Sequence, residues 1–256
     1  GLFADSPVDA QNVPLTWNNG SLVPETPVYW GSSQFVDESV AFYAYYPYSA
    51  VQNNIYVDGF TVQEDQTTHE GYTASDLMIA RTLAAPAEGT VNLNFIHHMT
   101  KLVLHVDNRL TDSEVAAITV GNVFVTASGG FGSEDGLLAT GDLGSVKAGK
   151  VVLETGETAW TAIIAPRQYV KPAILITMED GKEYVYQSDY GILFYGSKCY
   201  NASVIIDETS VSTDFTSNIT DWWEGGWFWF SQNVPSPYDG EWSIIGTVKG
   251  TNWDTD

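Results

Sequence analysis

The sequence has little positive charge. Its 256 residues include 10 Lys and Arg against 32 Asp and Glu, for a formal net charge of −22. No basic residue precedes Arg81, and after Lys198 only Lys249 follows. A field this negative repels phosphate backbones and anionic lipid headgroups, so it excludes nucleic acid as a partner. The charge is typical of a soluble exported protein, with attraction of cations as a secondary alternative.

Cysteine is almost absent, since Cys199 is the only one. A single thiol cannot form a disulfide within the chain. The alternating apolar run that follows it indicates a small core residue. The sequence has no signal peptide and no apolar run of about 18 residues, so it predicts no membrane-spanning segment. A mature secreted protein and a cytoplasmic one would both have these features.

Motifs for catalysis and for cofactors are missing too. His97 and His98 are adjacent, so on a strand they point to opposite faces and cannot share a metal ion, and His105 lies too far along the same strand. No zinc helix, nucleophile elbow or Cys/His dyad occurs. The Gly-rich segment 128–136 lacks the Lys-Ser/Thr ending of a phosphate loop and is predicted to be a surface loop. Some of the 32 carboxylates will pair by chance, but a glycosidase also needs one of them with a raised pKa. We therefore expect no enzyme, no metal and no cofactor.

Helix signals are scarce, and one capped turn at 111–118 is the best of them. Strand signals are abundant, because 13% of the residues are aromatic and 44% are hydrophobic. About a dozen short apolar runs bounded by turn residues predict an all-β fold of the sandwich type. The predicted strands are 40–46, 54–57, 60–63, 91–95, 101–106, 117–120, 122–126, 151–154, 160–165, 173–178, 183–186 and 201–207.

The two parts of the chain share a sequence pattern. In each, a strand stopped by proline is followed by two strands around an Asp-Gly pair, which is a strong hairpin signal. The pairs are Asp58-Gly59 and Asp180-Gly181. The repeated pattern predicts two tandem β-sandwich domains, with a boundary in the Ala- and Pro-containing segment 84–89. The predicted organisation is a first domain over 1–88, a second over 89–224, and a Trp-rich tail or the start of a further module over 225–256.

Several short segments resemble the fimbrillin family of Bacteroidales, the Mfa-like proteins that build type V pili. The start of the chain, GLFA, is similar to a family strand, and later segments follow in the family's order over about residues 1–224. The segments are PVYW (27–30), FYAYYP (42–47), DLMIA (76–80), NFIHHMTKLV (94–103), AP (165–166), GKEY (181–184), GSKCY (196–200) and ITDW (219–222).

This resemblance implies a pair of transthyretin-like Greek-key sandwiches, export as a lipoprotein and assembly into a surface fimbria at the outer membrane. In that scheme a protease removes an N-terminal strand, and a terminal strand of a neighbouring subunit fills the groove. The chain opens at the GLFA strand, so Gly1 is predicted to follow a removed strand or an artificial boundary. The expected role is a structural subunit or adhesin, not an enzyme. The expected partners are other fimbrial subunits or ligands on host and bacterial surfaces.

The tail is rich in tryptophan, with four Trp and two Phe between Asp221 and Phe230. It is predicted to be a final strand that covers an open sandwich edge, with Trp227 and Trp229 on one face. Residues 241–256 are also similar to the opening strand of glycan-binding modules in starch-utilisation outer-membrane lipoproteins. The alternative function is therefore a surface glycan-binding protein, with Trp227, Trp229 and Trp242 as candidate contacts for a sugar or a subunit. These last residues are too few to fold alone, so we expect them to be loosely held or to pack on the second domain.

Overall fold

A computed structural model of the chain describes residues 1–6, 8–18, 21–30, 39–85, 91–109, 113–132, 136–153, 155–206, 211–215 and 219–222, and the backbone of 227–233 and 243–249. Within these ranges almost all regular structure is β-strand, and a single short helix, α1 (His69–Ser75), interrupts the strands. The expected all-β fold is confirmed. Cys199 is buried in the larger hydrophobic core, as predicted.

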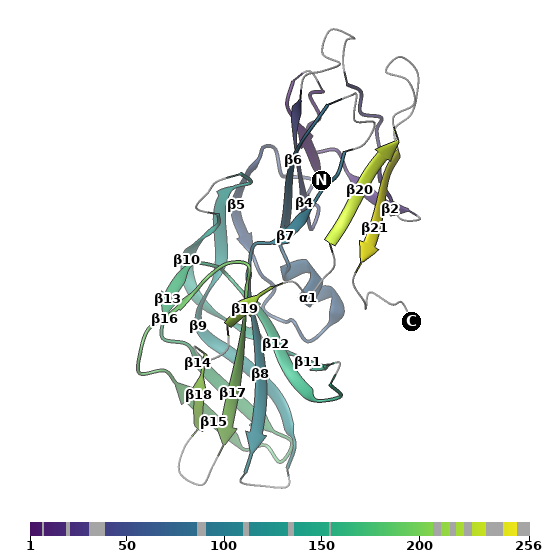
Figure 1. Cartoon of the computed structure of the whole chain (residues 1–256). Coiled ribbons are helices and arrows are strands. Elements are labelled where there is room, and N and C mark those ends of the chain that lie inside the picture. The colour runs from purple at the N-terminus through teal and green to yellow at the C-terminus, as the bar shows by residue number, and fades with distance from the viewer. Residues whose placement is uncertain are drawn as a thin grey trace.

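The strands form two groups and a terminal hairpin (Figure 1). The first half of the chain contains β1 (Leu2–Ala4), β2 (Leu15–Asn18), β3 (Ser21–Pro24), β4 (Val40–Tyr46), β5 (Tyr56–Thr61), β6 (Met78–Ala84) and β7 (Phe95–His97). The second half contains β8 (Thr100–Asn108), β9 (Val115–Gly130), β10 (Leu138–Lys147), β11 (Gly149–Val152), β12 (Thr158–Ile164), β13 (Gln168–Val170), β14 (Ala173–Met178), β15 (Glu183–Gln187), β16 (Ile192–Phe194), β17 (Lys198–Ile206), β18 (Val211–Asp214) and β19 (Ile219–Asp221). The terminal hairpin consists of β20 (Trp227–Asn233) and β21 (Ser243–Lys249).

A four-stranded antiparallel sheet in the order β1-β4-β6-β7 forms the centre of the first half. Its strand β4 has the predicted bounds and ends before Pro47. Six of its seven residues are buried, so both faces of the strand are covered. Tyr43 and Tyr45 face the larger of two hydrophobic cores, and Phe42 and Ala44 face the smaller one. Alternation along an extended strand explains this division between the two cores.

The second half is a β-sandwich. One sheet has the order β10-β9-β14-β15, and the other has the order β11-β12-β8-β17-β18 with β19 also paired to β17. The larger core fills the space between them, with Ile118 and Ile174 from one sheet and Leu102 and Val204 from the other. Strands β8 and β17 are parallel, while the other paired strands are antiparallel.

The long strand β9, of 16 residues, links the two halves. Its first part pairs with β14, and its last part pairs with β5 from the first half. The predicted strands 117–120 and 122–126 are therefore parts of one continuous strand. The predicted helical turn at 111–118 is wrong from Val115 onward, because these residues already belong to β9; residues 110–112 lie outside the described part of the chain.

The two Asp-Gly pairs behave differently. Asp180-Gly181 joins β14 to β15 in the predicted hairpin, with Gly181 at a φ of 82°. Asp58-Gly59 does not form a turn, since β5 runs straight through it and pairs with β9 on both sides. The register shifts between Val57 and Phe60, so this pair makes a β-bulge in which Gly59 takes the positive φ of 73°. The prediction of a hairpin at this position is wrong.

Two further predictions need correction. Of the predicted strand 91–95, only Phe95 is part of a ladder, although Val91 and Leu93 are buried in the smaller core. The predicted surface loop 128–136 begins with the end of β9, and Phe131 from this segment is buried in the larger core. Glycine allows the chain to pass close to its neighbours here, because a Cβ on Gly129 would lie 2.8 Å from the carbonyl oxygen of Gly136.

The helix α1 was not predicted from the sequence. Thr68 caps it, with its hydroxyl accepting a hydrogen bond from the Gly71 amide at 3.1 Å. Gly71 is required by close packing, since a Cβ at this position would lie 2.1 Å from the carbonyl oxygen of Asp65. A glycine one turn into the helix weakens the helical pattern, which explains why the element could not be predicted.

Two glutamine side chains form hydrogen bonds with backbone groups of distant strands. Gln66, which is buried, accepts a hydrogen bond from the Ile163 amide at 2.7 Å and donates to the Ile163 carbonyl at 2.9 Å. Gln168 does the same for Phe124, at 2.7 Å from its amide and 3.2 Å from its carbonyl. The segment after β5 is thereby fixed to β12 of the second half. The domain boundary near residue 88 stays a prediction, and β5 and Gln66 bond across it.

The terminal hairpin returns to the first half. Strand β21 lies alongside β3, and Figure 1 shows the β20–β21 hairpin next to the first half of the chain. This placement differs from the expectation that the end of the chain is loosely held or packs on the second domain. No helix in the described part of the chain is long and apolar enough to cross a membrane.

Candidate assembly surface

The first strand, β1, lies at the end of its ladder, and all three of its residues are buried. Phe3 is opposite Tyr43 of β4 and points into the larger core. On the other side, Leu2 exchanges two backbone hydrogen bonds with Val13, at N···O distances of 2.9 and 2.8 Å. A strand this short makes few backbone hydrogen bonds, so burial of its side chains contributes most of its attachment.

An aromatic cluster holds this strand against the end of β9. The rings of Phe3 and Tyr45 stack at 6.2 Å, and Phe131 meets both rings at 6.1 and 5.4 Å between centroids. The Tyr45 hydroxyl has two acceptors within hydrogen-bond distance of its single proton, Asn12 Oδ1 at 2.8 Å and the Ser49 carbonyl at 2.9 Å. Burial is the main cause that raises the pKa of Tyr45 above its usual value. Phe131 is a lone aromatic among glycines, and no local pattern indicates its place in the core.

The terminal hairpin carries two of the three predicted contact residues. In β20, Trp227 is opposite Lys249 and Trp229 is opposite Thr247. The two residues stand two positions apart on the same strand. The structure describes only the backbone here, and Trp242 lies outside the described residues. Sugar or subunit contact by these three tryptophans stays a prediction.

The segment that leads to the hairpin is anchored at the junction of the two halves. Trp222, which follows β19, is buried, and its indole stacks on the imidazole of His97 with centroids 4.2 Å apart. His97 Nδ1 in turn lies 2.7 Å from Asp76 Oδ1, and both residues are buried. Lys101 lies over the Trp222 ring at 5.9 Å. One side chain from each of four segments therefore meets at this point.

The polar groups at this junction bond to the backbone or are buried. The Ser197 hydroxyl donates to the His97 backbone carbonyl at 2.5 Å, so it is not directed at the imidazole as a nucleophile would be. Burial, with the neighbouring His97 as a smaller cause, lowers the pKa of His98 to about 4. His105 lies apart from both, with its Nδ1 at 2.9 Å from Glu157 on the surface. Within the described ranges, no group of three or more His, Cys, Asp or Glu could hold a metal ion.

The fold and the terminal strands define a class: an all-β protein of sandwich architecture whose last strands return to its first half. The model of the fimbrillin-like family matches residues 3–222. The chain therefore belongs to the fimbrillin-like family, as the order of the sequence motifs indicated. No curated protein sequence matches it significantly.

Solved structures from Bacteroides species share the fold. A protein from Bacteroides uniformis, described as a candidate cell adhesion protein, is 18% identical with a TM-score of 0.57, covering 87% of this chain and 90% of that one. A fimbrial protein from Bacteroides vulgatus is 14% identical with a TM-score of 0.53, covering 87% and 92%. A candidate cell adhesion protein from Bacteroides ovatus is 19% identical with a TM-score of 0.58, covering 72% and 68%. At these identities the likeness concerns the fold.

Proposed function

We propose that this protein is a structural subunit or adhesin of a bacterial surface fimbria, assembled by β-strand donation between subunits. Membership of the fimbrillin-like family supports the fimbrial role in general. The observation that carries the proposal of strand donation is the terminal hairpin, whose strand β21 lies alongside β3 in the first half. The end of the chain thus occupies a position beside a strand that lies far from it in the sequence.

Strand addition suits this position physically. Strands β2 and β3 form a sheet of only two strands, and a pair of strands alone is marginally stable in water. A donated strand that aligns with β3 would gain backbone hydrogen bonds and cover apolar side chains. Among the described strands of the single chain, β21 packs beside β3 without a ladder between them. The same strand can come from the chain itself or from a neighbouring subunit, as in domain swapping. A neighbour's hairpin in this position would join subunits head to tail.

The proposed role requires no catalytic group, and we assign none. The protein is placed at the cell surface, on the outer membrane as part of the fimbrium, after export as a lipoprotein precursor. Its partners are other fimbrial subunits, with ligands on host or bacterial surfaces for an adhesin. The net charge of −22 suits a protein exposed to the medium, because it keeps subunits soluble before assembly.

Exchange of the hairpin can be tested with two differently tagged copies of the chain that are unfolded and refolded together. We expect the wild-type copies to purify as mixed oligomers. Ile245→Pro should abolish mixing, because proline in the middle of β21 breaks the strand that Ile245 forms opposite Ser231. The matched control Ile245→Thr keeps a β-branched residue and should mix like wild type. Undiminished mixing of Ile245→Pro would rule out donation by β21.

A further inference from the structure

A small ribbon of two strands, β13 and β16, presents an aromatic surface to the solvent. Its inner residues Gln168, Val170 and Phe194 are buried. Its outer residues are Tyr169, which is 71% exposed, and Leu193, which is 40% exposed and lies opposite Tyr169 in the register. Side chains alternate between the two faces of each strand, which explains why some are buried and others exposed. The large Tyr169 ring on the outer face has no role in the core.

The Tyr169 ring has a defined position. A Cβ built on Gly191 would lie 2.2 Å from Cζ of Tyr169 and 2.5 Å from its hydroxyl oxygen, so the end of the ring rests on the Gly191 backbone. Gly191 has no positive φ, so its backbone conformation does not require glycine. The absence of a side chain at this position makes room for the ring. Tyr169 is therefore seated on the ribbon while most of it faces the solvent.

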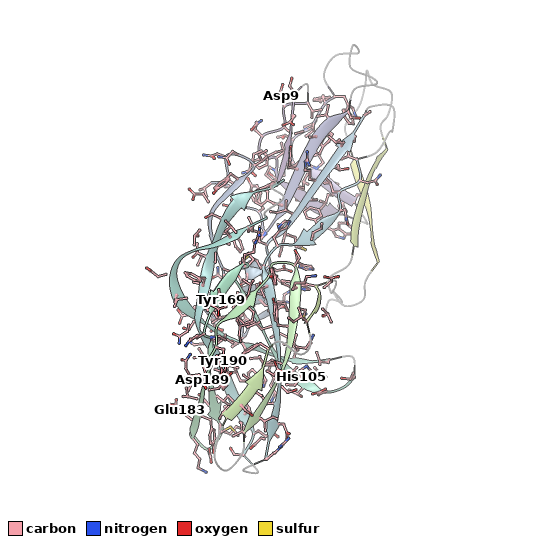
Figure 2. The ribbon with its side chains drawn as sticks, turned by 60° about the vertical axis from the view of Figure 1, so that its left-hand side comes forward. Asp9, His105, Tyr169, Glu183, Asp189 and Tyr190 are labelled. Carbon is pink, nitrogen blue, oxygen red and sulfur yellow. The ribbon has the colours of Figure 1, made fainter. Side chains whose placement is uncertain are left out.

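A second exposed tyrosine directly precedes the glycine on which the Tyr169 ring rests. Tyr190, the chain neighbour of Gly191, is 80% exposed. Figure 2 shows Tyr169 and Tyr190 on the same side of the second half, with Asp189 next to Tyr190. Lys171, one residue beyond β13, and Asp189 are both exposed, so the rings are flanked by charges of both signs. We call Tyr169, Tyr190, Gly191 and Leu193 the tyrosine platform.

We propose that the tyrosine platform binds an uncharged glycan chain. Flat aromatic faces pack on the apolar C–H faces of pyranose rings, and exposed Lys and Asp side chains donate to and accept from sugar hydroxyls. The net charge of −22 opposes an anionic ligand, and Lys171 beside the ring opposes a cationic one. A stable protein partner needs about 800 Å² of surface on each side, far more than two rings and a leucine supply.

This site is separate from the tryptophans of the tail and does not depend on exchange of the hairpin. It lies on the second half, whereas β21 lies beside β3 of the first half. A single folded chain suffices for binding, so failure of strand donation would leave this proposal intact, and the reverse also holds. A subunit with such a platform would act as an adhesin for sugars on neighbouring surfaces.

Native affinity electrophoresis through gels that contain mannan, xylan, galactan or soluble starch tests the proposal on the full chain. We expect at least one of these neutral polysaccharides to retard the wild-type protein. Tyr169→Ala and Tyr190→Ala should each weaken the apparent affinity about tenfold, the effect of losing one stacking ring. Tyr29→Ala removes another exposed tyrosine, 58% exposed, from the first half and should bind like wild type.

Gly191→Ala provides a sharper test, because it displaces the Tyr169 ring without removing it. It should weaken retardation as much as Tyr169→Ala does. The matched control is Gly121→Ala in β9, where the nearest atom to the added Cβ is 4.0 Å away, and which should bind normally. The proposal is overturned if no neutral polysaccharide retards the wild type, if only acidic polygalacturonate does, or if Tyr169→Ala binds as well as wild type. Self-association lost in Tyr169→Ala without sugar binding would make the platform a subunit contact instead.

Discussion

The indole of Trp222 stacks on the imidazole of His97, with their centroids 4.2 Å apart and their planes 7° from parallel. Trp222 is also the last residue matched by the family model. His97 is bonded to Asp76, so the stack connects the end of the sandwich to the segment that follows α1. The last residue of the matched region is thus held by a contact between residues of both halves.

Trp222→Ala should destabilise the protein by about 3–5 kcal/mol, the usual cost of removing a large buried aromatic side chain. The free energy of unfolding from urea denaturation measures this. Trp17→Ala is the control, because Trp17 is 43% exposed and its loss should cost much less. Equal losses for the two variants would show that the stack contributes nothing beyond an ordinary surface tryptophan.

Asp76 and His97 should be energetically coupled. Removing either partner leaves the other buried without its hydrogen bond, so Asp76→Ala and His97→Ala should each cost about 2–4 kcal/mol. The double variant should cost less than the sum, with a coupling energy of about 1–3 kcal/mol. A double-mutant cycle in urea gives this value. Strict additivity would mean that the 2.7 Å contact makes no net contribution.

Stability should fall as the pH drops below neutrality, in part because of His98. In the folded chain burial lowers the pKa of His98 from 6.5 to about 4, so between these values the unfolded chain binds the proton and the folded chain does not. Acidification from pH 7 to pH 5 should therefore cost at most about 2 kcal/mol through this residue. His98→Gln should be less sensitive over this range, as judged from urea midpoints. The same pH dependence in the variant would contradict this assignment.

Gln66→Leu should destabilise the junction by about 2–4 kcal/mol, because it leaves the amide and carbonyl of Ile163 buried without partners. Gln63→Leu is a matched control, since Gln63 is exposed and contributes only backbone atoms to the network. Thermal or urea unfolding measures both. A Gln66→Leu variant as stable as Gln63→Leu would show that solvent satisfies Ile163 without the amide.

Local patterns in the sequence predicted the strands that are apolar without interruption. Strand β4 has the predicted bounds because its residues are buried on both faces, and proline ends it. Strand β5 was missed as a continuous element because Asp58-Gly59 is also the pattern of a turn. Whether such a pair makes a turn or a bulge depends on the partner strand, and β9 lies far away in the sequence.

Contacts between distant residues could not be predicted in the same way. The resemblance marked Trp222 as the end of the matched region, but nothing local indicates its partners His97 and Asp76. The short β13 was not predicted at all. The exposure of Tyr169 can be recognised only from the pairing of β13 with β16. The tail tryptophans were conspicuous by composition, whereas the tyrosine platform required the fold.

Hydrogen exchange at β3 tests the central claim, that the terminal strand completes the first half and can be supplied by another chain. In the whole protein the β3 amides that point away from β2 should exchange slowly, because β21 lies beside β3. In a chain that ends at Trp222 they should exchange faster, and a separate peptide of residues 227–249 should restore the protection. Equal exchange in the whole and shortened chains, with no effect of the peptide, would contradict the account.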